Sequence, residues 1–86
     1  MTDEIIVPAS LDLAMNKGRF SEVESQCRNI LSIYEQSCRP ADFNLLTCLH
    51  ILARALEAQH KYEAGYKVRL RVRTLLSSLF GKSILG

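Results

Sequence analysis

The sequence predicts an all-α protein built from four antiparallel helices with short connections. Three observations favour this fold class. Apolar residues recur three and four positions apart through most of the 86 residues, which is the spacing of a helix face. No segment alternates apolar and polar residues between hairpin turns, so a sheet is not expected. The four glycines and two prolines are few and scattered, and short connections favour antiparallel neighbours.

Length and composition limit the class of protein further. A hydrophobic content of 48% argues against disorder, and 86 residues form one small domain with a thin stability margin. A domain of this size excludes a multi-step enzyme with its own cofactor-binding domain. The net charge of +2 provides no general attraction to nucleic acid or to a membrane surface.

The first two helices are predicted over about Pro8–Lys17 and Ser21–Gln36. A proline suits the first turn of a helix, where its missing N–H would have no partner. Ser21 and Glu24 match the S-x-x-E capping box that begins many helices, and Pro40 requires that the second helix has ended before it. The apolar stripes are Leu11, Ala14 and Met15 in the first helix, and Val23, Cys27, Ile30, Leu31 and Tyr34 in the second.

The third and fourth helices are predicted over Asp42–Ala58 and Tyr62–Leu79. Asp42 is a favourable N-cap residue because its carboxylate can accept from the first free backbone N–H groups. The third helix has the most regular apolar stripe in the chain: Leu45, Leu49, Leu52 and Leu56, widened by Leu46 and Ala53. The stripe of the fourth helix is Gly65, Val68, Val72, Leu75, Leu76 and Leu79.

An internal repeat relates the two halves at a distance of 42 residues. Phe20 corresponds to Tyr62 at this distance, and Ile30 corresponds to Val72. Each unit reads as helix, basic turn with an aromatic residue, and helix. We expect both aromatic rings to fill the wedge between their two helices. A small residue three positions later, Val23 or Gly65, would let the helices approach.

The segment Leu52-Ala53…His60-Lys61-Tyr62-Glu63-Ala64 and its degenerate copy Leu13-Ala14…Gly18-Arg19-Phe20-Ser21-Glu22 resemble the tetratricopeptide repeat, in particular the long-helix variety of kinesin light chains. The resemblance implies two helix-turn-helix units, residues 8–36 and 42–80, in one domain. This sequence departs from the family pattern at His60, where glycine is usual, and at Val23 and Gly65, where alanine is usual. The alternative is a non-repetitive four-helix bundle.

The resemblance implies a non-catalytic protein-interaction module, an adaptor or scaffold that binds a partner segment. In such repeats the first helix of each pair lines a concave face. Carried over by position, that face shows Asp12, Asn16, Thr47, His50, Arg54 and Glu57. The last four recur at i, i+3, i+7 and i+10 on the polar side of the third helix. The competing interpretation is that they form only the ordinary polar side of an amphipathic helix.

Other chemistries have little support in the residues. Cys48 and His50 lie two positions apart and point in different directions on a helix, so they cannot share a metal ion. No nucleophile motif, phosphate loop or pair of carboxylates is present, which predicts no catalysis and no cofactor. The cations of Lys67–Arg73 scatter around their helix without interleaved aromatic residues, which argues against nucleic acid.

Three cysteines without CxxC spacing indicate a reduced environment. The early apolar run Ile5–Val7 is too short for a membrane span or the core of a signal peptide. The sequence therefore predicts a cytoplasmic protein that does not enter a membrane.

The end of the chain has more apolar residues than one helix stripe can use. Leu76, Phe80, Ile84 and Leu85 are predicted to form an assembly interface, in a homo-oligomer or a larger complex. Residues 1–58 have five basic and eight acidic side chains, a net −3, whereas residues 59–86 have six and one, a net +5. The alternative function is thus a self-associating helical bundle, a structural or chaperone-type subunit. A competing account folds residues 81–86 back over the last helix pair.

Overall fold

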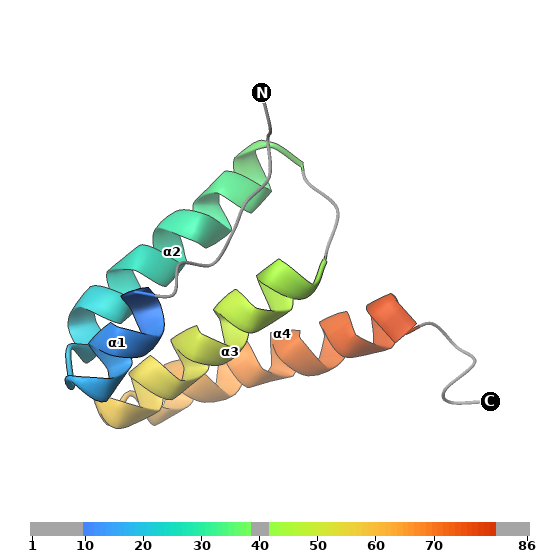
Figure 1. Cartoon of the computed structure of the whole chain (residues 1–86). Helices are drawn as coiled ribbons and strands as arrows, with labels where there is room; N and C mark the ends of the chain where they lie inside the picture. The colour runs from blue at the N-terminus through green and yellow to red at the C-terminus, as the bar shows by residue number, and fades with distance from the viewer. Residues whose placement is uncertain (1–9, 39–41, 81–86) are drawn as a thin grey trace.

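The computed structural model describes residues 10–38 and 42–80. In these ranges the chain forms four helices and no strand, in the order α1 (Ser10–Asn16), α2 (Phe20–Gln36), α3 (Phe43–Ala58) and α4 (Tyr62–Phe80) (Figure 1). The predicted all-α class is confirmed, and the observed helices agree with the predicted ranges to within about two residues at each end. Pro8, the predicted start of the first helix, lies outside the described residues.

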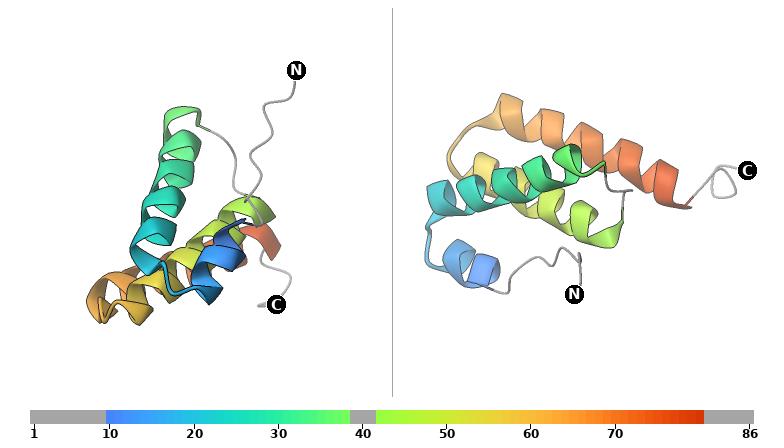
Figure 2. Two further views of the ribbon diagram at one scale, coloured as in Figure 1. Left: turned by 60° about the vertical axis from the view of Figure 1, so that its left-hand side comes forward. Right: turned by 90° about the horizontal axis from the view of Figure 1, so that it is seen from above.

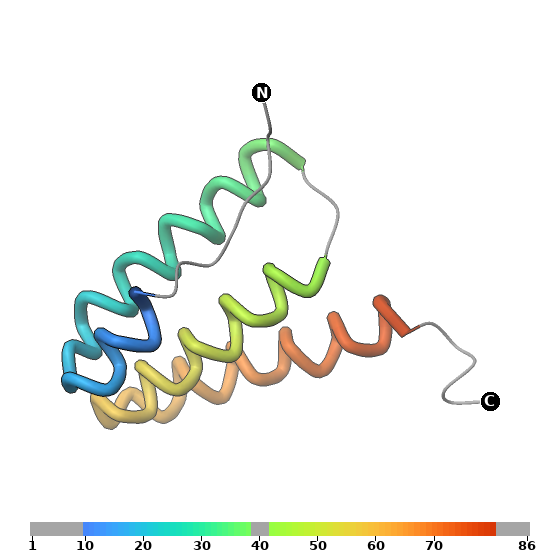
Figure 3. The backbone as a smooth tube through the Cα atoms, viewed as in Figure 1, coloured from blue at the N-terminus to red at the C-terminus, as the bar shows by residue number. Residues whose placement is uncertain are grey.

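The helices pack in sequence order, α1 on α2, α2 on α3 and α3 on α4. Consecutive helices are antiparallel. α4 runs alongside α3, whereas α2 and α3 converge near the α3–α4 turn and diverge towards the other end (Figures 2 and 3). α3 is therefore central, and eight of its sixteen residues are buried, namely Leu45, Cys48, Leu49, Ile51, Leu52, Ala53, Ala55 and Leu56.

The turn between α1 and α2 closes with paired backbone hydrogen bonds. The Gly18 N–H donates to the carbonyl of Met15 at 3.1 Å, and the Arg19 N–H donates to the carbonyl of Ala14 at 2.9 Å. This pair of bonds is a Schellman motif, which requires a left-handed residue just after the helix. Gly18 has that conformation, with φ of 76°.

The turn between α3 and α4 repeats the same motif 42 residues further on. The His60 N–H donates to the carbonyl of Glu57, and the Lys61 N–H donates to that of Leu56, both at 2.9 Å. His60 takes the place of the glycine and has φ of 65°. A side chain in the left-handed region is disfavoured by contact of its Cβ with the following carbonyl. The two turns thus share one backbone geometry, and this geometry is strained in the second turn because His60 has a side chain.

Gly65 brings α4 close to α3. It is buried, and a Cβ atom built there would lie 3.1 Å from Cγ of Glu57 and 3.5 Å from the carbonyl oxygen of Ala53. The expectation that a small residue permits a close approach here is confirmed. Val23, its counterpart on α2, is fully buried against the core.

The two aromatic residues after the turns differ in their surroundings. Phe20 is partly buried and packs against the core, as predicted. The prediction for Tyr62 is wrong, because its side chain is 60% exposed. Its hydroxyl instead lies 2.8 Å from Nδ1 of His60. Its ring also meets the ring of His60 edge-on, with centroids 5.7 Å apart, outside the helix pair.

Of the two predicted N-terminal caps, the structure has the one at α3 and lacks the one at α2. Oδ1 of Asp42 accepts from the backbone N–H of Leu45 at 2.9 Å, which confirms the cap of α3. The same oxygen accepts from the Tyr34 hydroxyl at 2.6 Å, so the cap also ties α3 to α2. The predicted Ser21–Glu24 capping box is wrong. α2 begins one residue earlier, after Arg19, and Glu24 has partners in the turn between α3 and α4.

Reciprocal substitutions at the two left-handed positions test the shared turn geometry. Gly18→Ala should lower the free energy of unfolding by about 1 kcal/mol, because alanine is strained at positive φ. His60→Gly should raise it by up to about 1 kcal/mol by removing the same strain. Urea denaturation followed by circular dichroism measures both. Equal signs for the two changes would contradict a common turn geometry.

Candidate functional site

The polar side of α3 presents Thr47, His50 and Arg54, and all three are exposed, as the helical spacing predicts. We call these three residues the polar face of α3. The Thr47 hydroxyl donates to the carbonyl of Phe43 at 2.9 Å, one turn back in its own helix. Within the described residues, Arg54 makes no hydrogen bond and no ion pair. Its guanidinium is available to a partner molecule.

Glu57 extends this spacing but has a different role. Its carboxylate accepts from Nε of Arg69 at 2.5 Å and from Nη2 of Arg69 at 2.8 Å. The Arg69 guanidinium lowers the pKa of Glu57, with a smaller contribution from His50. The carboxylate therefore joins α3 to α4 and is already occupied, although it is part of the predicted partner-binding set.

Asp12 and Asn16, the predicted contribution of the first unit, are exposed on α1. They lie four residues apart, so they share one side of this short helix. α1 packs mainly on α2. Within the described residues, no hydrogen bond or ion pair joins Asp12 or Asn16 to the polar face of α3. The structure therefore leaves them as a separate group of polar side chains.

The predicted assembly interface is partly described. Leu76 and Phe80 are 38% and 45% exposed, whereas Leu75 and Leu79 are only partly exposed, and Leu75 packs against the core. Leu76 and Phe80 are therefore apolar residues that the core stripe of α4 leaves exposed. The Phe80 ring meets the ring of Phe43 edge-on, with centroids 6.0 Å apart. Ile84 and Leu85 lie outside the described residues.

Sequence reasoning missed a surface that α3 and α4 form together. On α4, Arg69, Arg73, Leu76 and Phe80 follow i, i+4, i+7 and i+11, one exposed stripe. Two contacts join this stripe to α3: the ion pair with Glu57 and the ring contact with Phe43. We call these six residues the end face. The helical spacing of these four α4 residues can be read from the sequence, but the more continuous apolar stripe of the same helix dominates its pattern.

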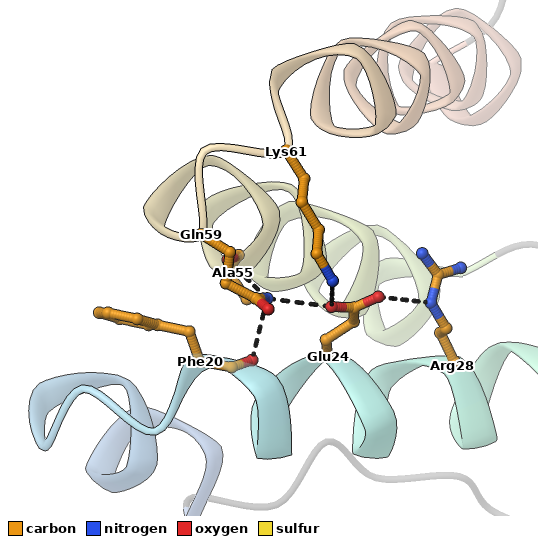
Figure 4. Close-up of polar contacts among 6 residues, drawn as sticks. All are labelled: Phe20, Glu24, Arg28, Ala55, Gln59 and Lys61. Carbon is orange, nitrogen blue, oxygen red and sulfur yellow. Dashed lines mark hydrogen bonds and ion pairs between the residues drawn. The ribbon is translucent and has the colours of Figure 1, made fainter.

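A second missed feature is a cluster around Glu24 that joins the two halves of the chain (Figure 4). Oε1 of Glu24 accepts from Nζ of Lys61 at 3.0 Å and from the Gln59 amide at 2.9 Å. Oε2 accepts from Nε of Arg28 at 3.0 Å. The Gln59 amide also reaches the carbonyl of Phe20 at 3.5 Å. One carboxylate on α2 thus holds the turn between α3 and α4.

These contacts favour the ionised form of Glu24. The hydrogen bond from Lys61 is the main cause, followed by those from Gln59 and Arg28, and burial opposes them. Together they lower the pKa of Glu24 from 4.5 to about 2. The Glu24 side chain is 16% exposed, so solvent screens these contacts less than it screens a fully exposed pair.

An apolar groove lies along the contact of α3 with α4. It has a volume of about 390 Å³ and is lined by Leu45, Leu49, Leu70, Leu75 and the polar Arg71, Thr74 and Ser78. No side-chain nitrogen or oxygen among the described residues is buried there without a partner. The polar residues of its lining, Arg71, Thr74 and Ser78, are all exposed.

The cysteines are placed as structural thiols. Cys27 and Cys48 are buried where α2 meets α3, and the Cys48 Sγ lies 3.5 Å from the Cys27 carbonyl oxygen, to which it donates. The contact with Cys27, together with burial, raises the pKa of the Cys48 thiol. Cys38 is exposed. Residues 10–38 and 42–80 contain no group of three potential metal ligands.

No helix in the described part of the chain is both long enough and apolar enough to cross a membrane. Comparison with models of protein families, with curated proteins and with solved structures found no match.

The Glu24 cluster predicts a pH dependence of stability. Because the pKa of Glu24 is lower in the folded chain, its contribution is complete above a pH of about 4.5 and is lost as the pH falls towards about 2. Glu24→Gln should lower the free energy of unfolding by about 1–2 kcal/mol at neutral pH, a value reduced for the half-exposed partners. Urea titrations at several pH values measure the difference from the unchanged chain.

Glu22→Gln is the matched control, since Glu22 is exposed on the same helix and makes no ion pair within the described residues. It should change the stability by less than about 0.5 kcal/mol. A difference for Glu24→Gln that stays constant below pH 4.5 would contradict the role of the cluster.

Proposed function

We propose that this chain is a non-catalytic protein-interaction module, an adaptor or scaffold, that binds a partner segment along the polar face of α3. The observation that carries the proposal is the state of Arg54. It is exposed on the central helix and has no bond to any described residue. A planar guanidinium in this state suits two parallel hydrogen bonds to a partner carboxylate.

The absence of buried polar chemistry supports binding at a surface rather than catalysis. Among the described residues, no polar or charged residue is buried. A catalytic site needs polar groups that a folded interior holds in place and partly shields from water. The polar and charged residues of the described ranges are exposed or partly exposed instead, where they suit contact with another macromolecule.

The repeated turn geometry supports the resemblance to tetratricopeptide repeats. The Schellman bonds at Gly18 and at His60 match in donor, acceptor and spacing. In such repeats the first helix of each unit lines the concave face. On this proposal α1 would contribute Asp12 and Asn16 to the same partner that contacts Arg54. The partner is then a protein segment, bound without a cofactor and in the cytoplasm.

Charge reversal at Arg54 tests the proposal. Arg54→Glu should reduce capture of the bound partner from a native lysate roughly ten-fold, the loss expected for one strong contact. The melting temperature should change by no more than about 2 °C, because the side chain contacts little of its own chain. Quantitative mass spectrometry of captured proteins and thermal circular dichroism supply the two measurements.

Lys67→Glu provides the matched control, since Lys67 is exposed on α4 and undergoes the same change in charge. Capture that falls equally with both variants would indicate a general charge effect. Capture that is unchanged by Arg54→Glu would leave the polar face of α3 as an ordinary solvated helix side.

A second candidate function is self-association as a structural or chaperone-type subunit. The observation that favours it is the exposure of Leu76 and Phe80 beside Phe43, three apolar side chains that a monomer leaves in water. A homo-oligomer would cover them. Exposed ion pairs between the acidic and basic parts of two copies would add little energy.

Sedimentation equilibrium tests this second candidate. If the chain self-associates through these side chains, the unchanged protein should sediment as an oligomer, and Leu76→Ser with Phe80→Ser should convert it to a monomer. Leu13→Ser is the control, because Leu13 is 60% exposed on α1, away from this patch. A monomeric unchanged chain would rule out the second candidate.

A further inference from the structure

The internal repeat gives the end face a counterpart inside the molecule. Counting 42 residues on from the buried side of α2, Cys27 corresponds to Arg69, Leu31 to Arg73 and Tyr34 to Leu76. The three residues on α2 are at most 7% exposed.

α3 covers this buried side of α2. The Cys48 thiol contacts the Cys27 carbonyl at 3.5 Å, and the Tyr34 hydroxyl contacts Asp42 at the start of α3. The corresponding side of α4 is exposed instead. It is the surface on which a helix would lie if the arrangement of α2 and α3 were repeated once more.

The chemistry of the two surfaces differs in a specific way. Where α2 has a thiol and a leucine, α4 has two arginines, while Leu76 keeps the apolar character of Tyr34 and Phe80 extends it to the end of α4. Arg69 is held by Glu57, and Arg73 makes no hydrogen bond or ion pair within the described residues. The end face is thus apolar where α4 ends and cationic along its middle.

We propose that the end face binds an amphipathic helix of a partner protein that has apolar side chains at one end and carboxylates along the rest. The apolar side chains would cover Leu76, Phe80 and the adjoining Phe43 ring. The carboxylates would lie opposite Arg73 and the outer side of Arg69. The helix would lie on α4 as α3 lies on α2.

Charge decides between this partner and a second copy of the chain. The end face has two arginines and one glutamate, a net positive charge. A symmetric contact would bring two such faces together, and like charges at an interface are unfavourable. A helix with carboxylates removes that repulsion and gives Arg73 a partner.

The end face borders the polar face of α3, because Glu57 lies three residues after Arg54 on the same side of that helix. The two proposals are distinguished by the side chains that each one requires. Arg54→Glu tests the first proposal, and the second rests instead on Arg73 and the apolar end of α4. Arg73→Glu tests the second, because Arg73 lies on α4, in the end-face stripe. Both side chains are exposed, so both variants should keep the fold.

The probe is a synthetic peptide of residues 42–58, the helix that covers the corresponding side of α2. Carrying Cys48→Glu and Ala55→Glu, it has two carboxylates seven residues apart on one side, at positions buried in α3. The matched control peptide carries Cys48→Lys and Ala55→Lys. We call the two probes the Glu peptide and the Lys peptide. Fluorescence anisotropy of each labelled peptide, titrated with the full chain, measures binding.

The Glu peptide should bind saturably and at least roughly ten-fold more tightly than the Lys peptide, and its affinity should fall as salt is added. Arg73→Glu in the protein should lower its affinity for the Glu peptide roughly ten-fold and raise its affinity for the Lys peptide. Lys67→Glu, the same charge change on the other side of α4, should alter either affinity by less than about three-fold.

Three results would overturn the proposal. The Glu peptide does not bind saturably; the two peptides bind equally; or Arg73→Glu and Lys67→Glu have equal effects. A concentration-dependent dimer that needs Leu76 and Phe80 but is indifferent to Arg73→Glu would assign the end face to a second copy instead.

Discussion

The burial of α3 between α2 and α4 is the constraint on which the rest of the structure depends. Each fully buried leucine in this helix contributes about 1.5–3 kcal/mol relative to an exposed one, and a domain this small has few others to replace it. α2 must therefore stay on one side of α3 and α4 on the other. Two polar contacts hold α2 on α3. The Glu24 cluster lies where α2 and α3 converge, and the hydrogen bond from Tyr34 to Asp42 lies where they diverge. They determine the orientation of helices that apolar contact alone would leave free to slide.

The two helix pairs share a backbone arrangement but differ in their side chains. The turns at Gly18 and His60 close with the same bonds, although only the first has the residue that tolerates a left-handed conformation. α2 presents an apolar surface that the chain covers itself, while the matching surface of α4 has arginines that remain in water. The same backbone arrangement thus places the surface of α2 in the interior and the corresponding surface of α4 on the exterior. The side chains decide which surface is buried within the chain and which is available to another molecule.

The available surfaces lie on the two helices that contact each other most extensively. Arg54 extends from α3, and Arg73 extends from α4. Because α3 is held on two sides, its exposed residues have a rigid support, which lowers the entropy lost on binding. The ion pair between Glu57 and Arg69 neutralises one cation of the end face and fixes its position. A module of this kind offers preorganised surface chemistry rather than an enclosed site.

The sequence by itself determined the four helices and the start of α3, because apolar spacing, the cap at Asp42 and the turn residues act over a few neighbouring positions. It also indicated the polar face of α3 and the surplus apolar residues at Leu76 and Phe80. Only the tertiary structure decided the partners of Glu24 and Glu57 and the exposure of Tyr62. Glu24 has a capping-box partner in the sequence, yet Lys61, 37 residues away, binds it more favourably once the helices pack. Charge contacts of this kind depend on distances between helices, and local periodicity does not encode those distances.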